Sequence, residues 1–195
     1  MGDVVIDPEQ RSITHLIVRP AGEPGSARLV PIDKAHGGDA DGSIELDRTA
    51  EEIDGSEAVH TARYLQIGEQ VKEDPGWGVG IEEITPMADF GGFVPGGMNA
   101  GAGPTELDSH VTASYDRVPE GEVEIRHGSE VTSSKGEHVG HVNGFLTDDE
   151  HRITDFVLAH GHLWGKREIL IPIASVARIE NDELVLSVPK AEVGR

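Results

Sequence analysis

The most distinctive chemistry-bearing residues of this chain lie in one short stretch, His160-Gly-His-Leu-Trp-Gly-Lys-Arg167. Trp164 is one of only two tryptophans, and Lys166 and Arg167 are adjacent cations in a chain of formal net charge −20. Tryptophan offers a large contact area and arginine a planar set of donors, so both types often anchor protein interfaces. We therefore predict that His162, Trp164, Lys166 and Arg167 bind a protein partner.

A second interpretation of the same stretch stays open beside the first. Trp164 could fold over the end of its own domain, while the two cations pair with nearby carboxylates. The candidates for these ion pairs are Asp148, Asp149 and Asp155. Both interpretations can hold together, because one side chain can pack locally and still present a contact surface.

The histidines of this region point to a different chemistry, that of a metal or small-ligand sensor. His160 and His162 would share one face of a strand, and His138 and His141 lie in the same part of the chain. The spacing shows no third ligand, and Gly161 favours a turn. We therefore expect no metal site, and a sensor that uses these four histidines is the alternative function.

No residue pattern predicts catalysis or a cofactor. The chain has no cysteine, which excludes thiol nucleophiles and Cys-based metal sites, and it has no Gly-x-Ser-x-Gly motif. Gly76-Trp-Gly-Val-Gly80 follows a proline and precedes no predicted helix, so it is not a dinucleotide loop. Acidic residues outnumber basic ones by 36 to 16, and this charge repels phosphate. We expect a non-enzymatic protein that does not bind nucleic acid directly.

The N-terminus and the distribution of apolar residues predict a cytoplasmic protein. Met1–Pro8 has neither the basic start nor the apolar run of a signal peptide. No stretch approaches 18 consecutive apolar residues, so we expect no membrane insertion.

Two segments of the chain are similar to each other at an offset of about 140 residues. Residues 4–18 align with 145–158 with one gap, 27–32 with 168–173, and 43–46 with 183–186. Three matches in order at one offset indicate a duplicated unit. β-Branched and aromatic runs predict strands in each copy, and each copy closes with a short helical signal, at 47–53 and at 187–193.

These patterns predict an all-β protein with two small β-rich units joined by a Gly-rich segment, and short terminal helices. The predicted parts are a first unit at 1–59, a linker or insert at 60–118, and a second unit at 119–195. The insert contains two candidate strands, 64–67 and 79–84, and a Gly-rich loop at 89–107.

The motifs of the third part resemble a known family. They are Gly-Ser-Glu-Val (128–131) with Gly-Glu-His-Val-Gly-His-Val (136–142), Asp-Asp-Glu-x-Arg-Ile-Thr (148–154) and Ile-Leu-Ile-Pro-Ile-x-x-Val (169–176). This pattern resembles the PRC-barrel domain, which occurs in the cytoplasmic H subunit of photosynthetic reaction centres and at the C-terminus of the ribosome-maturation factor RimM. The first part resembles the same domain from its second or third strand onward. The resemblance therefore implies two small PRC-type β-barrels, an incomplete one at 1–59 and a complete one at 119–195.

The resemblance implies a non-catalytic adaptor or scaffold that docks a protein partner. The assemblies that it suggests are those of ribosome or RNA processing, of the cell envelope and of electron transfer.

The first part lacks the opening strand of the barrel, which leaves an apolar strand edge unpaired. Such an edge invites pairing with another strand. We expect residues 64–67, residues 79–84 or a second copy of the chain to cover it, and a second copy would give a homodimer. A further interpretation is that the true start of the protein lies upstream.

Overall fold

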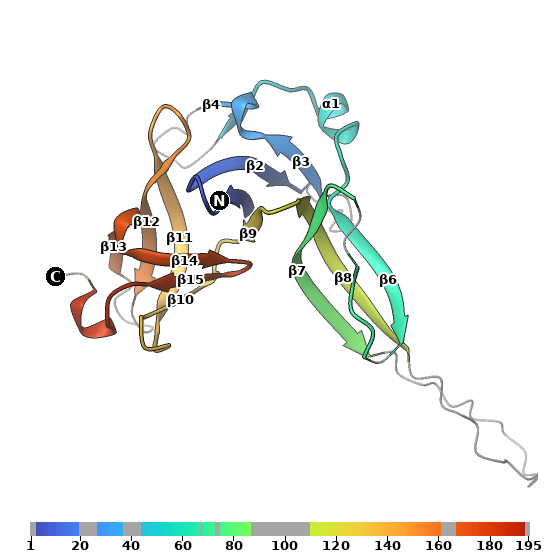
Figure 1. The fold of residues 1–195 in the computed structure, drawn as a ribbon. Coiled ribbons are helices and arrows are strands. Elements are labelled where there is room, and N and C mark those ends of the chain that lie inside the picture. Colours follow the sequence, from blue (N-terminus) through green and yellow to red (C-terminus); the bar gives the residue numbers. More distant parts are fainter. Residues whose placement is uncertain are drawn as a thin grey trace, which may run out of the picture.

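The computed structural model describes residues 3–19, 27–36, 44–66, 68–72, 75–86, 110–160 and 167–193. The regular structure of these residues consists mainly of strands, with one short α-helix and three 3-10 turns, so the predicted all-β class is confirmed (Figure 1). The strands form four sheets, of which three position the sites described below.

The N-terminal sheet has the strand order β3-β2-β1-β9. Its strands are β1 (Asp3–Asp7), β2 (Ser12–Val18), β3 (Arg28–Pro31) and β9 (Val123–Ile125). After β3 follow the 3-10 turn η1 (Ile32–Lys34), the short strand pair β4 (Ala35–His36) and β5 (Glu45–Leu46), and the helix α1 (Ala50–Asp54). Thr49 and Glu52 form a capping box at the start of α1, as the predicted helical signal requires.

The strand that covers the edge of β1 is β9, which was not among the expected candidates. Val4 pairs with Ile125 and Ile6 with Val123 in an antiparallel register. The expectation that 64–67, 79–84 or a second copy of the chain fills this gap is therefore wrong. Both candidate segments instead pair with a third strand, β8. β9 comes from within residues 119–195, the part that was predicted to form the C-terminal unit alone.

The insert forms a three-stranded antiparallel sheet with the order β6-β8-β7. Its strands are β6 (His60–Gln66), β7 (Trp77–Pro86) and β8 (His110–Pro119). The far end of this sheet extends away from the other two sheets (Figure 1). The central strand β8 was not predicted, and the Gly-rich loop at 89–107 lies outside the described residues.

The C-terminal sheet has six strands in the order β13-β12-β11-β10-β15-β14. They are β10 (Glu130–Thr132), β11 (His138–Thr147), β12 (Ile153–His160), β13 (Arg167–Pro172), β14 (Val176–Glu180) and β15 (Glu183–Leu186). The 3-10 turns η2 (Ile173–Ser175) and η3 (Lys190–Glu192) follow β13 and β15. The predicted closing helix at 187–193 is therefore only a 3-10 turn, and the side chains near Pro189 do not cap it.

The hairpins β1–β2 and β11–β12 have the same local geometry. Each contains a bulge at the same place, between Val5 and Ile6 and between Leu146 and Thr147. The hydroxyl of Thr14 donates to the carbonyl of Val5 at 3.2 Å, and the hydroxyl of Thr154 donates to the carbonyl of Leu146 at 3.2 Å. This correspondence allows the two units to be compared position by position.

The turns of these two hairpins also bind each other. The backbone N–H of Ile13 donates to the carbonyl of His151 at 3.0 Å, and that of Ile153 donates to the carbonyl of Arg11 at 2.9 Å. Arg11 and His151 have the same left-handed backbone conformation, with φ of 55° and 60°. The hairpins therefore meet in a reciprocal contact through corresponding residues.

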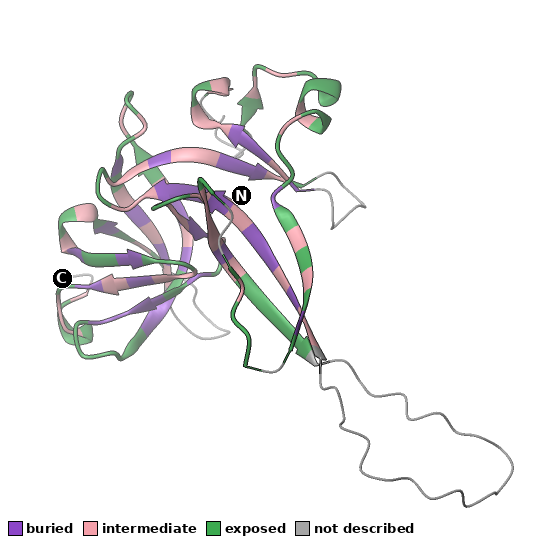
Figure 2. Ribbon diagram, turned by 45° about the vertical axis from the view of Figure 1, so that its right-hand side comes forward, coloured by how far each residue is buried: buried purple, intermediate pink, exposed green. Residues whose placement is uncertain are grey.

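One hydrophobic core is shared between the N-terminal and C-terminal sheets. Leu16 of β2 and Phe156 of β12 occupy corresponding positions and belong to the same cluster of buried residues. Ile13 and Ile153 correspond in the same way and join that cluster. Figure 2 shows buried residues along the strands of both units. The two predicted barrels therefore do not have separate cores.

Candidate functional site

The predicted partner-binding residues lie at the connection between β12 and β13. His162, Trp164 and Lys166 are outside the described residues. The backbone of Arg167 begins β13, where it pairs with His160 of β12, and its side chain is also outside the described part. Their role in partner binding stays a prediction. In the sequence they stand between β12 and β13, and β13 is the outermost strand at one end of the six-strand order.

The outer face of β11, β12 and β13 carries exposed apolar side chains beside this connection. Leu146 of β11 is 44 % exposed and Leu170 of β13 is 55 % exposed. Val157 of β12 lies between them, paired with Leu170 on one side and with Gly144 on the other. Val157 is half-buried in this position. We call Leu146, Val157 and Leu170 the C-terminal outer face.

The corresponding face of the N-terminal sheet is buried. The pairing of the strands shows which residues correspond. Val5 corresponds to Leu146, because Val5 pairs with His15 as Leu146 pairs with Asp155. Two residues further along the second strand of each hairpin, Ile17 corresponds to Val157. In the same way Leu29 of β3 corresponds to Leu170 of β13.

Val5, Ile17 and Leu29 are 0 %, 3 % and 6 % exposed. We call these three residues the N-terminal outer face. They are buried because other parts of the chain cover them.

The insert and the segment before it cover the N-terminal outer face. Val59, Val118 and Trp77 pack against it in the second buried cluster of the molecule. The cover also pairs with the edge of β3 through backbone hydrogen bonds. The N–H of Leu29 donates to the carbonyl of Glu57 at 3.1 Å, and the N–H of Val59 donates to the carbonyl of Ala27 at 3.0 Å. The N-terminal outer face is thus sealed by the same chain.

Polar groups border the C-terminal outer face. The imidazole Nε2 of His127 lies 2.9 Å from Oδ1 of Asn143, and the Asn143 amide donates to Glu168 at 2.7 Å. An apolar centre with a polar rim is the ordinary anatomy of a protein interface. The exposed leucines and their rim therefore have the composition of a contact surface.

The four histidines of the alternative sensor function are brought together only in part. The rings of His138 and His141 lie 4.9 Å apart, but the side chains of His160 and His162 are outside the described residues. His138 Nδ1 is 3.0 Å from a carboxylate oxygen of Glu130, and His141 Nδ1 is 3.0 Å from a backbone carbonyl. Within the described ranges, no group of three or more His, Asp or Glu side chains could hold a metal ion.

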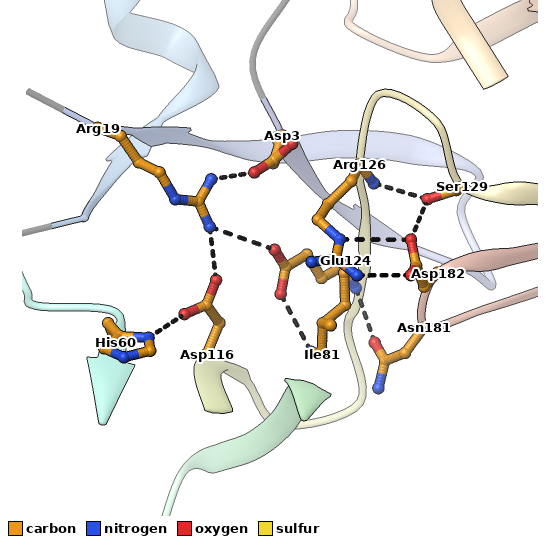
Figure 3. A network of polar contacts seen from close by, with 10 residues as sticks. All are labelled: Asp3, Arg19, His60, Ile81, Asp116, Glu124, Arg126, Ser129, Asn181 and Asp182. Carbon is orange, nitrogen blue, oxygen red and sulfur yellow. Dashed lines mark hydrogen bonds and ion pairs between the residues drawn. The ribbon is translucent and has the colours of Figure 1, made fainter. Parts of the chain in front are cut away.

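A second cluster lies where the insert, the N-terminal sheet and the C-terminal sheet meet (Figure 3). Its centre is Glu124 of β9, which is fully buried. Oε2 of Glu124 accepts a hydrogen bond from the backbone N–H of Ile81 at 3.1 Å. Oε1 has no hydrogen-bond partner among the described residues and lies 3.9 Å from Nη2 of Arg19. We call this cluster the junction.

The charges of the junction do not balance if every acid is ionised. Arg19 donates to the carboxylates of Asp3 and Asp116, at 2.8 Å to the latter. His60 Nδ1 lies 3.2 Å from the other oxygen of Asp116. Three acids thus surround one permanent cation, and Glu124 is the most buried of them. Ionising a carboxyl group without a full partner in such a place is costly.

Burial is the largest cause that raises the pKa of Glu124, and the negative charge of Asp116 is the second. Together they bring its pKa to about 8. The backbone also holds the group tightly, because a Cβ at Gly80 would lie only 2.7 Å from Oε2. The junction can therefore take up and release a proton near neutral pH.

The junction was not found from the sequence. With 36 acidic residues in the chain, no pairing of two carboxylates stands out. Asp3, Asp116 and Glu124 come from β1, β8 and β9, and only the unpredicted pairing of β9 with β1 brings them together. The one local signal was a single acid between Val123 and Ile125 in a β-type run.

Comparison with known proteins gives one family match. Residues 127–193 match the model of the PRC-barrel domain, which confirms the resemblance seen in the third part of the sequence. No curated protein matches the chain. None of the helices in the described part of the chain is long and apolar enough to cross a membrane.

Proposed function

Since residues 127–193 of the chain form a PRC-barrel domain, we propose that the protein is a non-catalytic adaptor that docks a protein partner on this domain. The docking surface combines the C-terminal outer face with the predicted contact residues His162, Trp164, Lys166 and Arg167. In the sequence, these residues run directly into β13, which carries Leu170 of the C-terminal outer face.

The observation that carries this proposal is the contrast between the two outer faces. The same apolar positions are buried under the insert in the N-terminal sheet, whereas in the C-terminal sheet Leu146 and Leu170 are exposed and Val157 is half-buried. Removing apolar surface from water is favourable by about 25 cal/mol per Å² of buried area. A partner that covers Leu146, Val157 and Leu170 would be stabilised by the same burial of apolar surface that the chain already achieves at Val5, Ile17 and Leu29.

The proposal extends to the origin and the setting of the protein. The N-terminal unit is a second, incomplete copy of the PRC barrel that uses β9 as its opening strand. The shared bulge, the shared threonine hydrogen bond and the left-handed turn residues support this. The protein acts in the cytoplasm, a setting that fits a chain without cysteine.

Affinity capture from cells of the source organism tests the adaptor role. Wild type, Trp164→Ala and Leu170→Lys serve as baits, and Ile84→Lys is the matched control because Ile84 is 59 % exposed on the insert. We expect one protein to be retained by wild type and the control and lost from the other two baits.

The retained protein is then purified and its affinity measured directly. Loss of a central interface anchor costs about 2 kcal/mol, or about 30-fold in Kd. Equal affinity for wild type, Trp164→Ala and Leu170→Lys would remove this surface from the proposed function.

A further inference from the structure

The edge of β13 differs from the edge of β3 in one respect. Both strands are the outermost members of their sheets. The edge of β3 is extended by the segment Glu57–Val59, through an antiparallel bridge between Arg28 and Ala58. The edge of β13 lies at the end of the six-strand order, beside the exposed Leu170 (Figure 1).

The correspondence of the two units identifies the backbone groups available at β13. In β3 the N–H of Leu29 and the carbonyl of Ala27 bind the covering segment. Leu170 and Glu168 occupy the same places in β13, because β13 pairs with β12 in the register in which β3 pairs with β2. Groups that face away from the neighbouring strand can pair with an added strand.

From these contacts we infer that the partner adds an extended apolar segment to the edge of β13, as Glu57–Val59 is added to β3. This inference rests on the proposed function and specifies its chemistry. A carbonyl of the partner accepts from the N–H of Leu170. The N–H two residues later donates to the carbonyl of Glu168. The apolar side chain of that later residue, which corresponds to the fully buried Val59, covers Leu170 and Val157.

The occupant is a segment of another protein, for two reasons. The chain's own covering segment is already used at β3, where it is fixed by hydrogen bonds on both sides of Ala58. A second copy of the chain would also bring a formal charge of −20 against a molecule of the same charge.

The probe for this inference is an acetylated and amidated peptide with the sequence of residues 55–61. The full-length ¹⁵N-labelled protein is titrated with this peptide, and amide shifts are followed by NMR. We expect saturable shifts centred on Glu168 and Leu170 of β13 and on Val157 of β12. The variant Leu170→Lys should weaken binding about tenfold, because it removes the apolar contact.

Two methylated peptides separate strand addition from apolar contact alone. Methylation of the nitrogen of Val59 removes the donor to the carbonyl of Glu168 and should weaken binding about fivefold or more. Methylation of the nitrogen of Ala58 is the matched control, because alternation along a strand turns that N–H away from β13. Equal binding of both methylated peptides, or shifts that avoid β13, would overturn the inference.

The result is independent of the capture experiment. A purified partner that needs Trp164 and Leu170, together with a peptide that does not bind β13, would keep the adaptor and reject strand addition. Peptide binding to β13 without a captured partner would keep strand addition and reject the adaptor role. Sedimentation of wild type should show a monomer, and a dimer that Leu170→Lys abolishes would assign the face to a second copy and overturn the choice of partner.

Discussion

The two outer faces of this molecule have nearly the same residues and opposite environments. Val5, Ile17 and Leu29 lie under the insert, whereas their counterparts Leu146, Val157 and Leu170 face solvent or are only half-buried. Their side chains are aliphatic in both units, so local sequence does not explain the difference. The difference lies in the cover, because Val59, Val118 and Trp77 pack on the N-terminal outer face.

The two units also differ in which strands pair with their edges. β1 lacks a local opening strand and takes β9 from far along the chain, while β11 pairs with β10, which precedes it directly. β3 takes Glu57–Val59 in addition. The N-terminal unit thus depends on distant segments of the chain, and the C-terminal unit depends on them less.

The largest expected effect is a loss of folding stability that differs between the two outer faces. Leu29→Ala should lower the free energy of unfolding by about 2–4 kcal/mol, because it leaves a cavity in a packed cluster. Leu170→Ala at the corresponding exposed position should cost less than about 0.5 kcal/mol. Urea denaturation followed by circular dichroism measures both. Equal losses would show that the two faces are covered alike in solution.

A second prediction sharpens the role of the junction, where the cover of the N-terminal face is attached. The pKa of Glu124 is raised to about 8 in the folded protein from an ordinary value of 4.5, so the folded state holds its proton more tightly than the unfolded chain does. This contribution to stability is complete below about pH 4.5 and is lost as pH rises toward 8. Across that window wild type should lose up to about 1.4 kcal/mol per pH unit relative to Glu124→Gln.

Denaturant titrations at a series of pH values give the two stability curves for this comparison. Glu83→Gln is the matched control, because it makes the same chemical change at an exposed carboxylate on β7 of the insert. The control should follow wild type. Parallel curves for wild type and Glu124→Gln would mean that Glu124 is ionised in the folded protein throughout.

The smallest expected effect concerns the arginine side chains in the turns of the two hairpins, Arg11 and Arg152. The guanidinium of Arg11 donates to the carbonyls of Ile173 and Val176 in the C-terminal unit, at 3.1 and 3.4 Å. Arg11→Ala should therefore cost about 1 kcal/mol. Arg152→Ala removes only exposed ion pairs with Asp148 and Glu150 and should cost about 0.5 kcal/mol or less.

Thermal unfolding of both variants, read against the same wild-type sample, checks this difference. A loss for Arg152→Ala as large as that for Arg11→Ala would contradict the unequal roles of the two turns.

Local elements were predicted well where one segment contains its own signal. The β-branched and aromatic runs of the two copies predicted strands, and β2 and β12 are such strands. β8 was missed although Val111, Ala113 and Tyr115 alternate with polar residues, because its place as a central strand depends on pairing with two other strands.

The candidate sites differ in how far the sequence could predict them. The contact residues around Trp164 were chosen from residue type and charge background, which are visible in the sequence. The exposed Leu170 was not singled out, because a leucine in an apolar strand reads as core until its surroundings are known. Glu124 was one acid among many until β9 was placed beside β1.

The sequence by itself determined the all-β class, the hairpins of both units and the PRC-barrel resemblance of the C-terminal one, because turns, alternation and strand propensity act over a few residues. Only the tertiary structure decided which strand completes β1, which outer face is covered and which acid is buried. Those outcomes depend on pairing between segments as far apart as Val4 and Ile125, and on burial that no single segment can provide.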